Sequence, residues 1–325
     1  MGKIYFKIIL PIFFILNSSF QVNVNSRINY IQYFKNIQNA ENLIAKGNID
    51  EAINEYLKNL NYFEFNFGRD LYHAIQLTCL RKDKKNVFKF LHRALIEGID
   101  IEFIKETPII KDYLNRNQEI DRGLKLLSDT IKKDYFKKYN LNLRKDVIKD
   151  YCQCISKGNK IELENVQKFY VDYSYKNWKN KQTFIGEKYI GYFNISVPTN
   201  SCEKSSRSVF PDILVNIYGY CPCSLTKFSS DIDTLLKYGE IQPRFLALWQ
   251  TMQFDAIFTL KKNFPCLKPK TRPFDYGIGT RSSEPLGFDI QSINNHRSQI
   301  YLPPKDTDEK IFEWSKSSNF KFIID

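Results

Sequence analysis

The stretch Ala-Lys-Gly-Asn-Ile-Asp-Glu-Ala-Ile-Asn-Glu-Tyr, residues 45–56, decides how the front half of this 325-residue chain is organised. Gly47 and Asn48 interrupt an apolar pattern in the way that residues at a helix end do, because both tolerate backbone conformations that other residues avoid. Asp50 suits the start of a new helix, where the helix dipole favours a negative charge. The apolar residues that follow recur at the spacing of one helix face. The stretch therefore predicts a turn between two amphipathic helices.

The same helical spacing extends to both sides of this turn. Residues 28–47 and residues 50–60 each carry apolar side chains three and four positions apart. An aromatic link over residues 62–68 leads to a third amphipathic segment, residues 71–80, and a fourth, residues 87–98. The front half is therefore expected to consist of consecutive helices joined by short turns.

These helices repeat along the chain. Ala52 and Tyr56 lie 35 positions before Val87 and Leu91, and all four belong to apolar helix faces. A helix–turn–helix unit of about 34 residues is the period of tetratricopeptide repeats. Residues 30–100 resemble that family, and the stretch quoted above resembles its turn and second helix. An ordinary helical bundle is the alternative interpretation.

If the resemblance holds, it implies a concave surface for a protein or peptide partner. Two such units do not bury a continuous core alone, so residues 102–139 are expected to supply further helices. Positions on the first helix of each unit would be exposed and face the concave side. The possible partner-binding residues are Gln32, Lys35, Tyr72 and Gln76.

The first 26 residues have the layout of a secretory signal peptide. Lys3 and Lys7 precede the uncharged run at residues 8–16, and small polar residues follow as far as Ser26. A membrane-spanning helix needs about 20 apolar residues, which is more than this run supplies. We therefore expect cleavage after Ser26, no transmembrane helix in the mature chain, and export to the periplasm, cell envelope or extracellular space. A permanent membrane anchor is the alternative.

The back half has a mixed pattern. Residues 189–197, 213–218 and 320–324 are rich in β-branched and aromatic residues and predict strands, whereas other segments have helical spacing. The predicted organisation is therefore a helical-repeat domain at residues 27–140 followed by an α+β domain of unassigned function at residues 141–325.

An alternative function is a secreted, hydrolase-like enzyme with its site in the carboxy-terminal domain. Residues 276–277 and 295–303 resemble carboxy-terminal domains of exported proteins, and those domains have no assigned activity. A thiol beside an imidazole base is one arrangement that gives a nucleophile. The side chains that would form such a site are Cys223, Tyr276, His296 and Arg297.

The seven cysteines leave several interpretations open. Two Cys-x-Cys pairs, Cys152 with Cys154 and Cys221 with Cys223, supply four thiols, but the usual spacing in structural zinc sites is wider. Export favours disulfide bonds, and an odd count leaves at least one thiol over. Cys79 lies on an apolar helix face and is expected in the core.

The net charge of +12 admits an anionic envelope component as a partner. Lysine outnumbers arginine, the basic residues are scattered, and no groove-reading motif accompanies them, so nucleic acid is not expected. No catalytic residue, cofactor or metal ligand is assigned. The sequence favours an exported, non-catalytic binding or scaffold protein whose helical-repeat surface takes a protein or envelope partner.

Overall fold

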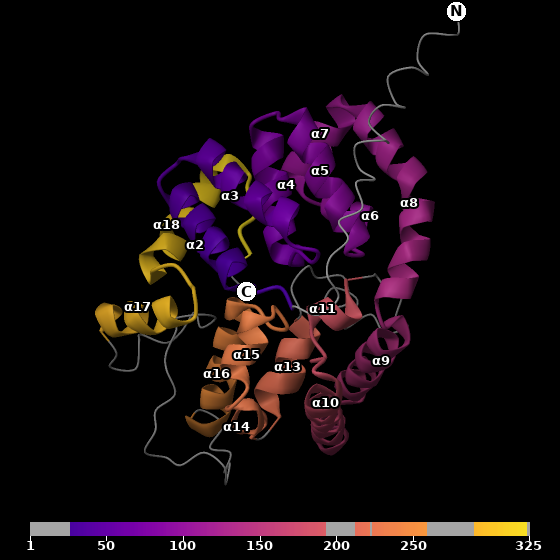
Figure 1. Cartoon of the computed structure of the whole chain (residues 1–325), viewed down its shortest axis with the longest axis vertical. Helices are drawn as coiled ribbons and strands as arrows, with labels where there is room; N and C mark the ends of the chain where they lie inside the picture. The colour runs from indigo at the N-terminus through magenta and orange to yellow at the C-terminus, as the bar shows by residue number, and fades with distance from the viewer. Residues whose placement is uncertain (1–26, 193–211, 222, 259–288, 324–325) are drawn as a thin grey trace, which may run out of the picture.

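The computed structural model describes residues 27–192, 212–221, 223–258 and 289–323 (Figure 1). Within these ranges the chain is 77% helical and contains no strand. The predicted signal peptide at residues 1–26 lies outside the described residues.

The helices follow one another closely along the chain. The front half contains α2 (Ile31–Ala45), α3 (Ile49–Tyr62), α4 (Gly68–Leu80), α5 (Lys84–Ile96), α6 (Ile101–Lys105), α7 (Pro108–Arg116) and α8 (Gln118–Lys138). The middle contains α9 (Leu141–Lys157), α10 (Lys160–Lys181) and α11 (Glu187–Ile190). The remaining described helices are α13 (Asp212–Tyr220), α14 (Ser224–Phe228), α15 (Ile232–Lys237), α16 (Pro243–Phe258), α17 (Ile290–Gln299) and α18 (Lys305–Ser318).

The front half has the helical-repeat-like arrangement that its sequence predicts. α2 packs against α3, and α4 packs against α5 and α7. Gly47 forms the first turn with a φ of +78°, in the left-handed region that favours glycine. Ala52 and Tyr56 on α3 and Val87 and Leu91 on α5 are buried, as their spacing predicts. The apolar stripes of successive helices thus form one shared interior.

The prediction of an α+β carboxy-terminal domain is wrong. Residues 213–218, expected as a strand, lie within α13, and residues 187–190 form α11. Residues 193–197 of the other expected strand lie outside the described part. Residues 320–323 are not helical, and within the described part of the chain no strand pairs with them.

The error at α13 has a clear physical cause. This helix packs between α10 and α16, and most of its residues are buried. A helix that is buried on most sides carries no polar stripe, so its sequence shows no 3.6-residue period. A short apolar run of this kind cannot be assigned to a strand or to a buried helix by periodicity.

One hydrophobic cluster contains residues from both sides of the predicted boundary at residue 140. Tyr30 joins the two halves directly, because its backbone N–H donates to the carbonyl oxygen of Lys237 at 2.7 Å. The Tyr30 hydroxyl also donates to the carbonyl oxygen of Phe65 at 3.2 Å. Tyr30 therefore ties the start of α2 both to the end of α15 and to the link before α4.

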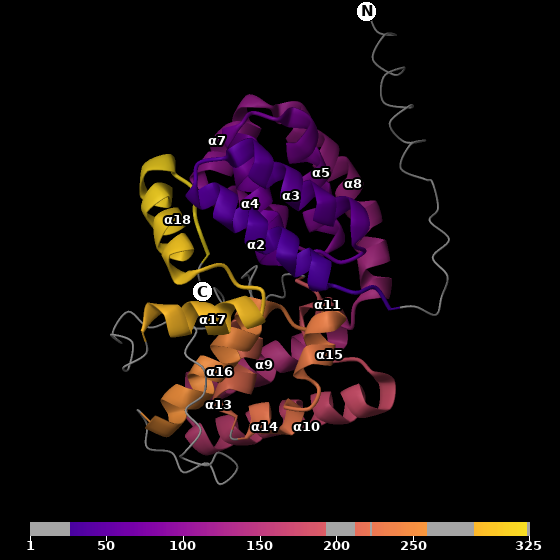
Figure 2. The ribbon, with the colours of Figure 1, turned by 60° about the vertical axis from the view of Figure 1, so that its left-hand side comes forward.

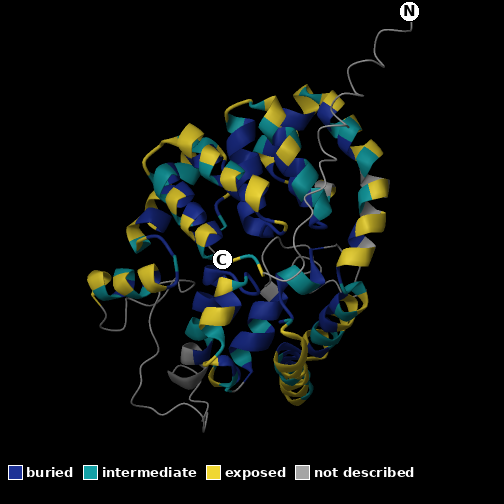
Figure 3. Ribbon diagram, in the orientation of Figure 1, coloured by how far each residue is buried: buried dark blue, intermediate teal, exposed yellow. Residues whose placement is uncertain are grey.

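The end of the described chain returns to the front half. α18 lies alongside α2 in both views of the ribbon (Figures 1 and 2), and the two helices pack against each other. Exposed residues gather on the outer sides of the helices, and buried residues face the interior (Figure 3). Among the described residues, no helix combines the length and the apolar character needed to cross a membrane.

Candidate functional site

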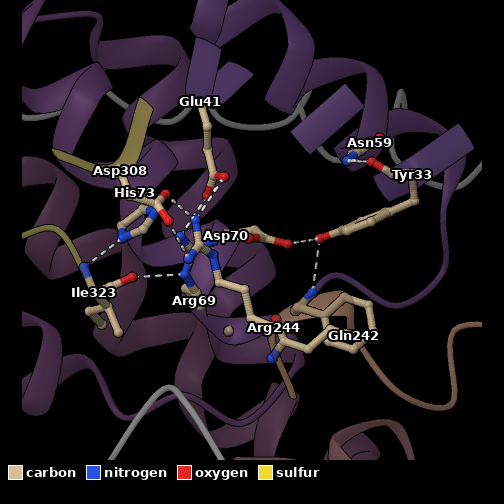
Figure 4. Close-up of polar contacts among 12 residues, drawn as sticks. Tyr33, Glu41, Asn59, Arg69, Asp70, His73, Gln242, Arg244, Asp308 and Ile323 are labelled. Atoms are coloured by element: carbon tan, nitrogen blue, oxygen red, sulfur yellow. Dashed lines mark hydrogen bonds and ion pairs between the residues drawn. The ribbon is translucent and has the colours of Figure 1, made fainter. Parts of the chain in front are cut away.

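Six charged side chains meet in the interior where the front half, α16 and the last helices come together. We call them the charged cluster: Glu41 from α2, Arg69 and Asp70 from α4, Arg244 from α16, Arg297 from α17 and Asp308 from α18. Each is buried, and most are drawn in Figure 4. Charged side chains are rarely buried unless they are paired, so such a group in one place requires an explanation.

The charges of the cluster alternate in sign. Glu41 accepts from Arg69 at 2.6 Å and from Arg244 at 3.1 Å, so one carboxylate bridges two guanidinium groups. Asp308 accepts from Arg244 at 2.6 Å and also from Arg297. Asp70 completes the row beside Arg69. Three arginines thus face three carboxylates.

Burial favours a higher pKa for both aspartates of the cluster, but only one of the two pKa values is raised above its usual value. Burial raises the pKa of Asp308, yet the two adjacent arginines, Arg244 and Arg297, outweigh it and hold that pKa below 3.8. Burial raises the pKa of Asp70 to about 6, although Arg69 and the hydroxyl of Tyr33, which donates to Asp70 at 2.9 Å, act against it. Asp308 therefore stays charged and ties α18 to α16 and α17. Arg244 extends this link to Glu41 on α2.

A second set of polar side chains lies on one face of α4. Arg69, His73 and Gln76, which we call the α4 ladder, are spaced by four and three residues and so share one face of the helix. All three are buried. Helix α4 is in fact buried along almost its whole length, because α3, α5 and α7 pack on it and residues 320–323 cover the remaining side.

The α4 ladder holds the main chain of residues 320–323, which we call the C-terminal segment. The backbone N–H of Lys321 donates to Oε1 of Gln76 at 2.7 Å, and Nε2 of Gln76 donates to the Lys321 carbonyl oxygen at 3.0 Å. The N–H of Ile323 donates to Nε2 of His73 at 3.0 Å, and Nε of Arg69 donates to the Ile323 carbonyl oxygen at 2.9 Å (Figure 4).

These four bonds follow the geometry of an extended chain. In a strand, the N–H and C=O groups of residues i and i+2 point to the same edge. Lys321 and Ile323 use both groups towards α4, while burial alternates from Phe320 to Lys321 to Phe322. The ladder therefore takes the place of a neighbouring strand. This explains why the segment has the composition of a strand although no strand pairs with it among the described residues.

The aromatic side chains of the segment occupy the space beside the ladder. The ring of Phe322 stacks on His73 with 4.9 Å between centroids. The guanidinium groups of Arg69 and Arg244 lie 5.4 and 5.8 Å from the Phe322 centroid, within the range of cation–π attraction. Phe320 packs on His73 and on Trp314 of α18. The segment thus contacts both the ladder and the charged cluster.

The four residues predicted to bind a partner occupy two kinds of place. Gln32 and Lys35 on α2 are exposed, and Gln32 donates to Asn36 at 2.8 Å. The expectation that Tyr72 and Gln76 are exposed is wrong, because both are buried. The Tyr72 hydroxyl bonds with Thr107, and Gln76 binds the C-terminal segment. The sequence could not show that residues 320–323 cover α4.

The structure describes three of the four residues named for the enzyme alternative. Arg297 is buried and bound to Asp308 and to the carbonyl oxygen of Pro303. Cys223 is disulfide-bonded and in that state is not a thiolate nucleophile. His296 lies on α17, and Tyr276 lies outside the described residues.

Cys152 is also disulfide-bonded. Cys79 and Cys154 are buried free thiols, and burial raises the pKa of both. Cys202 and Cys266 lie outside the described residues. In the described part of the chain, no group of three or more histidine, cysteine or acidic side chains is placed to hold a metal ion.

Sequence reasoning missed the charged cluster and the ladder. One signal was present, because Glu41 lies between Ala40 and Ile44 on the apolar face of α2. A charge at a core position indicates a buried partner. Its partner Arg244 lies 203 positions away along the chain, however, and nothing in the local sequence identifies it.

Comparison of the chain with protein-family models, with curated proteins and with solved structures found no match in any of the three.

Proposed function

We propose that this chain is an exported, non-catalytic binding protein that takes an extended segment of a protein partner on the inner face of α4. The observation that carries the proposal is the α4 ladder, whose three side chains bond to the main chain of the C-terminal segment. Main-chain hydrogen bonds are the means by which proteins bind extended peptides with affinity, and side-chain pockets add the specificity.

The composition of the ladder supports binding. Gln76 offers an acceptor to the N–H and a donor to the C=O of Lys321. His73 offers an acceptor to the N–H of Ile323, and Arg69 offers a donor to its C=O. None of these bonds depends on the side chains of the bound segment. The same face can therefore hold another extended chain of suitable shape.

Export is supported by two independent features. The first 26 residues have the order of a signal peptide, and Cys152 and Cys223 are disulfide-bonded. Disulfide bonds persist mainly in oxidising compartments such as the periplasm and the extracellular space. Mass spectrometry of protein secreted by an expressing cell should give a mature chain that begins after Ser26. Recovery of the intact chain from the cytoplasm would contradict export.

A direct test of binding uses the full chain with its own segment weakened. The double variant Phe320→Ala with Phe322→Ala removes both aromatic anchors and leaves the ladder intact. A fluorescent peptide of residues 317–323 should then bind to it in trans with a saturable rise in polarisation. Adding Gln76→Ala should weaken binding at least tenfold, which is about 1.4 kcal/mol. If the folded double variant binds this peptide no better than a shuffled peptide, the proposal fails.

A further inference from the structure

The C-terminal segment lies on the proposed binding face, where a partner would lie. It is held by main-chain bonds that are independent of its sequence. We infer that residues 320–323 are a built-in competitor, and that the partner is a protein carrying an extended segment with two aromatic residues separated by one residue. This inference rests on the proposed function and adds its regulation and the pattern of its ligand.

The aromatic pattern follows from the surroundings of Phe322. Its ring stacks on His73 and lies within cation–π range of Arg69 and Arg244. Two cations around one ring attract an aromatic face and repel a lysine or arginine side chain. Phe320 fills the adjoining space between His73 and Trp314. A competing segment therefore needs aromatic residues at both places and has no basic residue there.

The middle position places no such demand on the ligand. Lys321 is exposed between the two buried phenylalanines, and only its main chain meets the ladder. Its side chain can therefore be replaced without loss of a contact to α4. The ligand pattern is thus aromatic, any residue, aromatic, followed by a residue whose main chain reaches Arg69 and His73.

The connection to α18 allows the segment to leave alone. α18 ends at Ser318, and Asn319 turns the chain with a φ of +56° in the left-handed region. α18 itself is held upstream of this turn, by Asp308 in the charged cluster and by the buried side chain of Ile311. Release of residues 320–323 therefore leaves the ion pairs of α18 in place.

The fit of the segment to the ladder is incomplete. His73 accepts a hydrogen bond at Nε2, so in its neutral form the proton is on Nδ1. Within the described residues, this buried Nδ1 has no hydrogen-bond partner. Burial, with Arg69 and Arg244 adding to it, lowers the pKa of His73 and keeps the ring neutral. A buried donor without an acceptor weakens the bound state, so the segment is a weaker ligand than one that satisfies it.

The decisive comparison is between the wild-type chain and the single variant Phe322→Ala, both full length. A tethered competitor lowers the apparent affinity for a free ligand by the fraction of molecules in which the site is open. The labelled peptide of residues 317–323 should bind to Phe322→Ala at least tenfold more tightly than to the wild type. Lys321→Ala, which changes only the exposed side chain, should bind the peptide as the wild type does.

Specificity is tested with peptides in which the aromatic residues are changed. A peptide with alanine at the positions of Phe320 and Phe322 should lose binding, whereas one with alanine at the position of Lys321 should keep it. If these two peptides and the unchanged peptide of residues 317–323 bound equally well, the assigned pattern would be overturned.

Hydrogen–deuterium exchange on the wild type avoids dependence on any variant. An excess of isotopically labelled peptide should speed exchange at the amides of Lys321 and Ile323, because the free peptide displaces them from the ladder. Unchanged exchange under saturating peptide would overturn the inference, and so would equal affinity of the wild type and Phe322→Ala.

If the double variant bound no peptide, the proposed function itself would fail. A concentration-dependent dimer that exchanges its segments would replace the foreign partner by a second copy and would also overturn the inference.

Discussion

The side-chain amide of Gln76 makes two hydrogen bonds to the main chain of Lys321, one as acceptor at 2.7 Å and one as donor at 3.0 Å. The two residues are 245 positions apart in the sequence. Through both its N–H and its C=O, a single residue near the end of the described chain is thus fixed to α4. This relationship joins the helical-repeat-like front half to the last helix without any regular secondary structure.

Replacing Gln76 with alanine should destabilise the fold. The change removes both bonds and leaves partly buried main-chain groups of Lys321 without their partner, which costs about 2 kcal/mol. Urea unfolding followed by circular dichroism measures the loss. Lys35→Ala, at an exposed site on α2, is the control and should stay within about 0.5 kcal/mol of wild type. Equal stability of the Gln76→Ala variant and the wild type would show that the ladder does not hold the segment.

Neutralising Asp308 should lower the free energy of unfolding by more than replacing Gln76 does. This carboxylate contacts Arg244 and Arg297, and neutralising it removes a negative charge from beside two buried guanidinium groups, of which Arg244 keeps its pair with Glu41. Breaking a buried ion pair by changing one partner typically costs about 3–5 kcal/mol. We expect a loss of that size for Asp308→Asn in the same unfolding assay.

The matched control for this variant lies on the same helix. Asp306 pairs with Lys310, but both side chains are more than half exposed, at 53% and 61%. Exposed pairs contribute about 0–1 kcal/mol. Asp306→Asn should therefore behave almost as the wild type does. Similar losses for both variants would indicate that the charged cluster contributes no more than a surface pair.

The front half could be predicted because its information is local. In α3, Ala52 and Tyr56 lie at helical spacing and mark the buried face of the helix. Gly47 marks the turn before it. Each feature is contained within one or two turns of helix. The apolar pattern therefore predicts directly that these residues are buried.

The back half and the site could not be predicted in the same way, because their information is long-range. Residues 213–218 are apolar on nearly every side of α13, so their sequence contains no period to read. Gln76 looked like an exposed polar residue, because the segment that covers it lies at the far end of the chain. A polar residue at a buried position is therefore predicted to be exposed, since no local signal identifies a distant partner.

A close approach between Tyr30 and Gly239 provides a test of the junction between the two halves. A Cβ atom at Gly239 would lie 2.5 Å from Cγ of the Tyr30 ring, and the φ of Gly239 is +64°. Gly239→Ala should therefore suffer both backbone strain and a clash with a buried ring. Gly47 also has a positive φ, but nothing lies within 4 Å of its Cβ position.

The comparison of the two alanine variants isolates the clash. Gly47→Ala should lose only the cost of the left-handed backbone, about 1–2 kcal/mol. Gly239→Ala should lose about 1–3 kcal/mol more, the usual cost of overpacking a core. Thermal unfolding of both variants gives the difference. If the two lose the same stability, Tyr30 is not packed against Gly239 as described.

The last prediction concerns pH and the buried carboxyl group of Glu187. Burial raises its pKa to about 8, more than the hydrogen bonds from Tyr192 and Gln242 lower it. The folded pKa lies above the unfolded value of 4.5, so the native state binds more protons between these values. Stability must then fall as pH rises from about 4.5 to about 8.

The range from pH 6.5 to 8 separates Glu187 from its neighbours. Asp70, with a pKa of about 6, is largely ionised there. The pKa of His73 is lowered in the folded chain, so this group titrates in the unfolded chain near 6.5, and that contribution is common to the wild type and Glu187→Gln. The wild type should lose up to about 2 kcal/mol across this range, at 1.36 kcal/mol per unit. Glu187→Gln should lose much less over the same range, whatever its absolute stability. Glu51→Gln, at an exposed position of α3, should keep the wild-type slope. Parallel slopes for the wild type and Glu187→Gln would show that this carboxyl group titrates equally in the folded and unfolded chain.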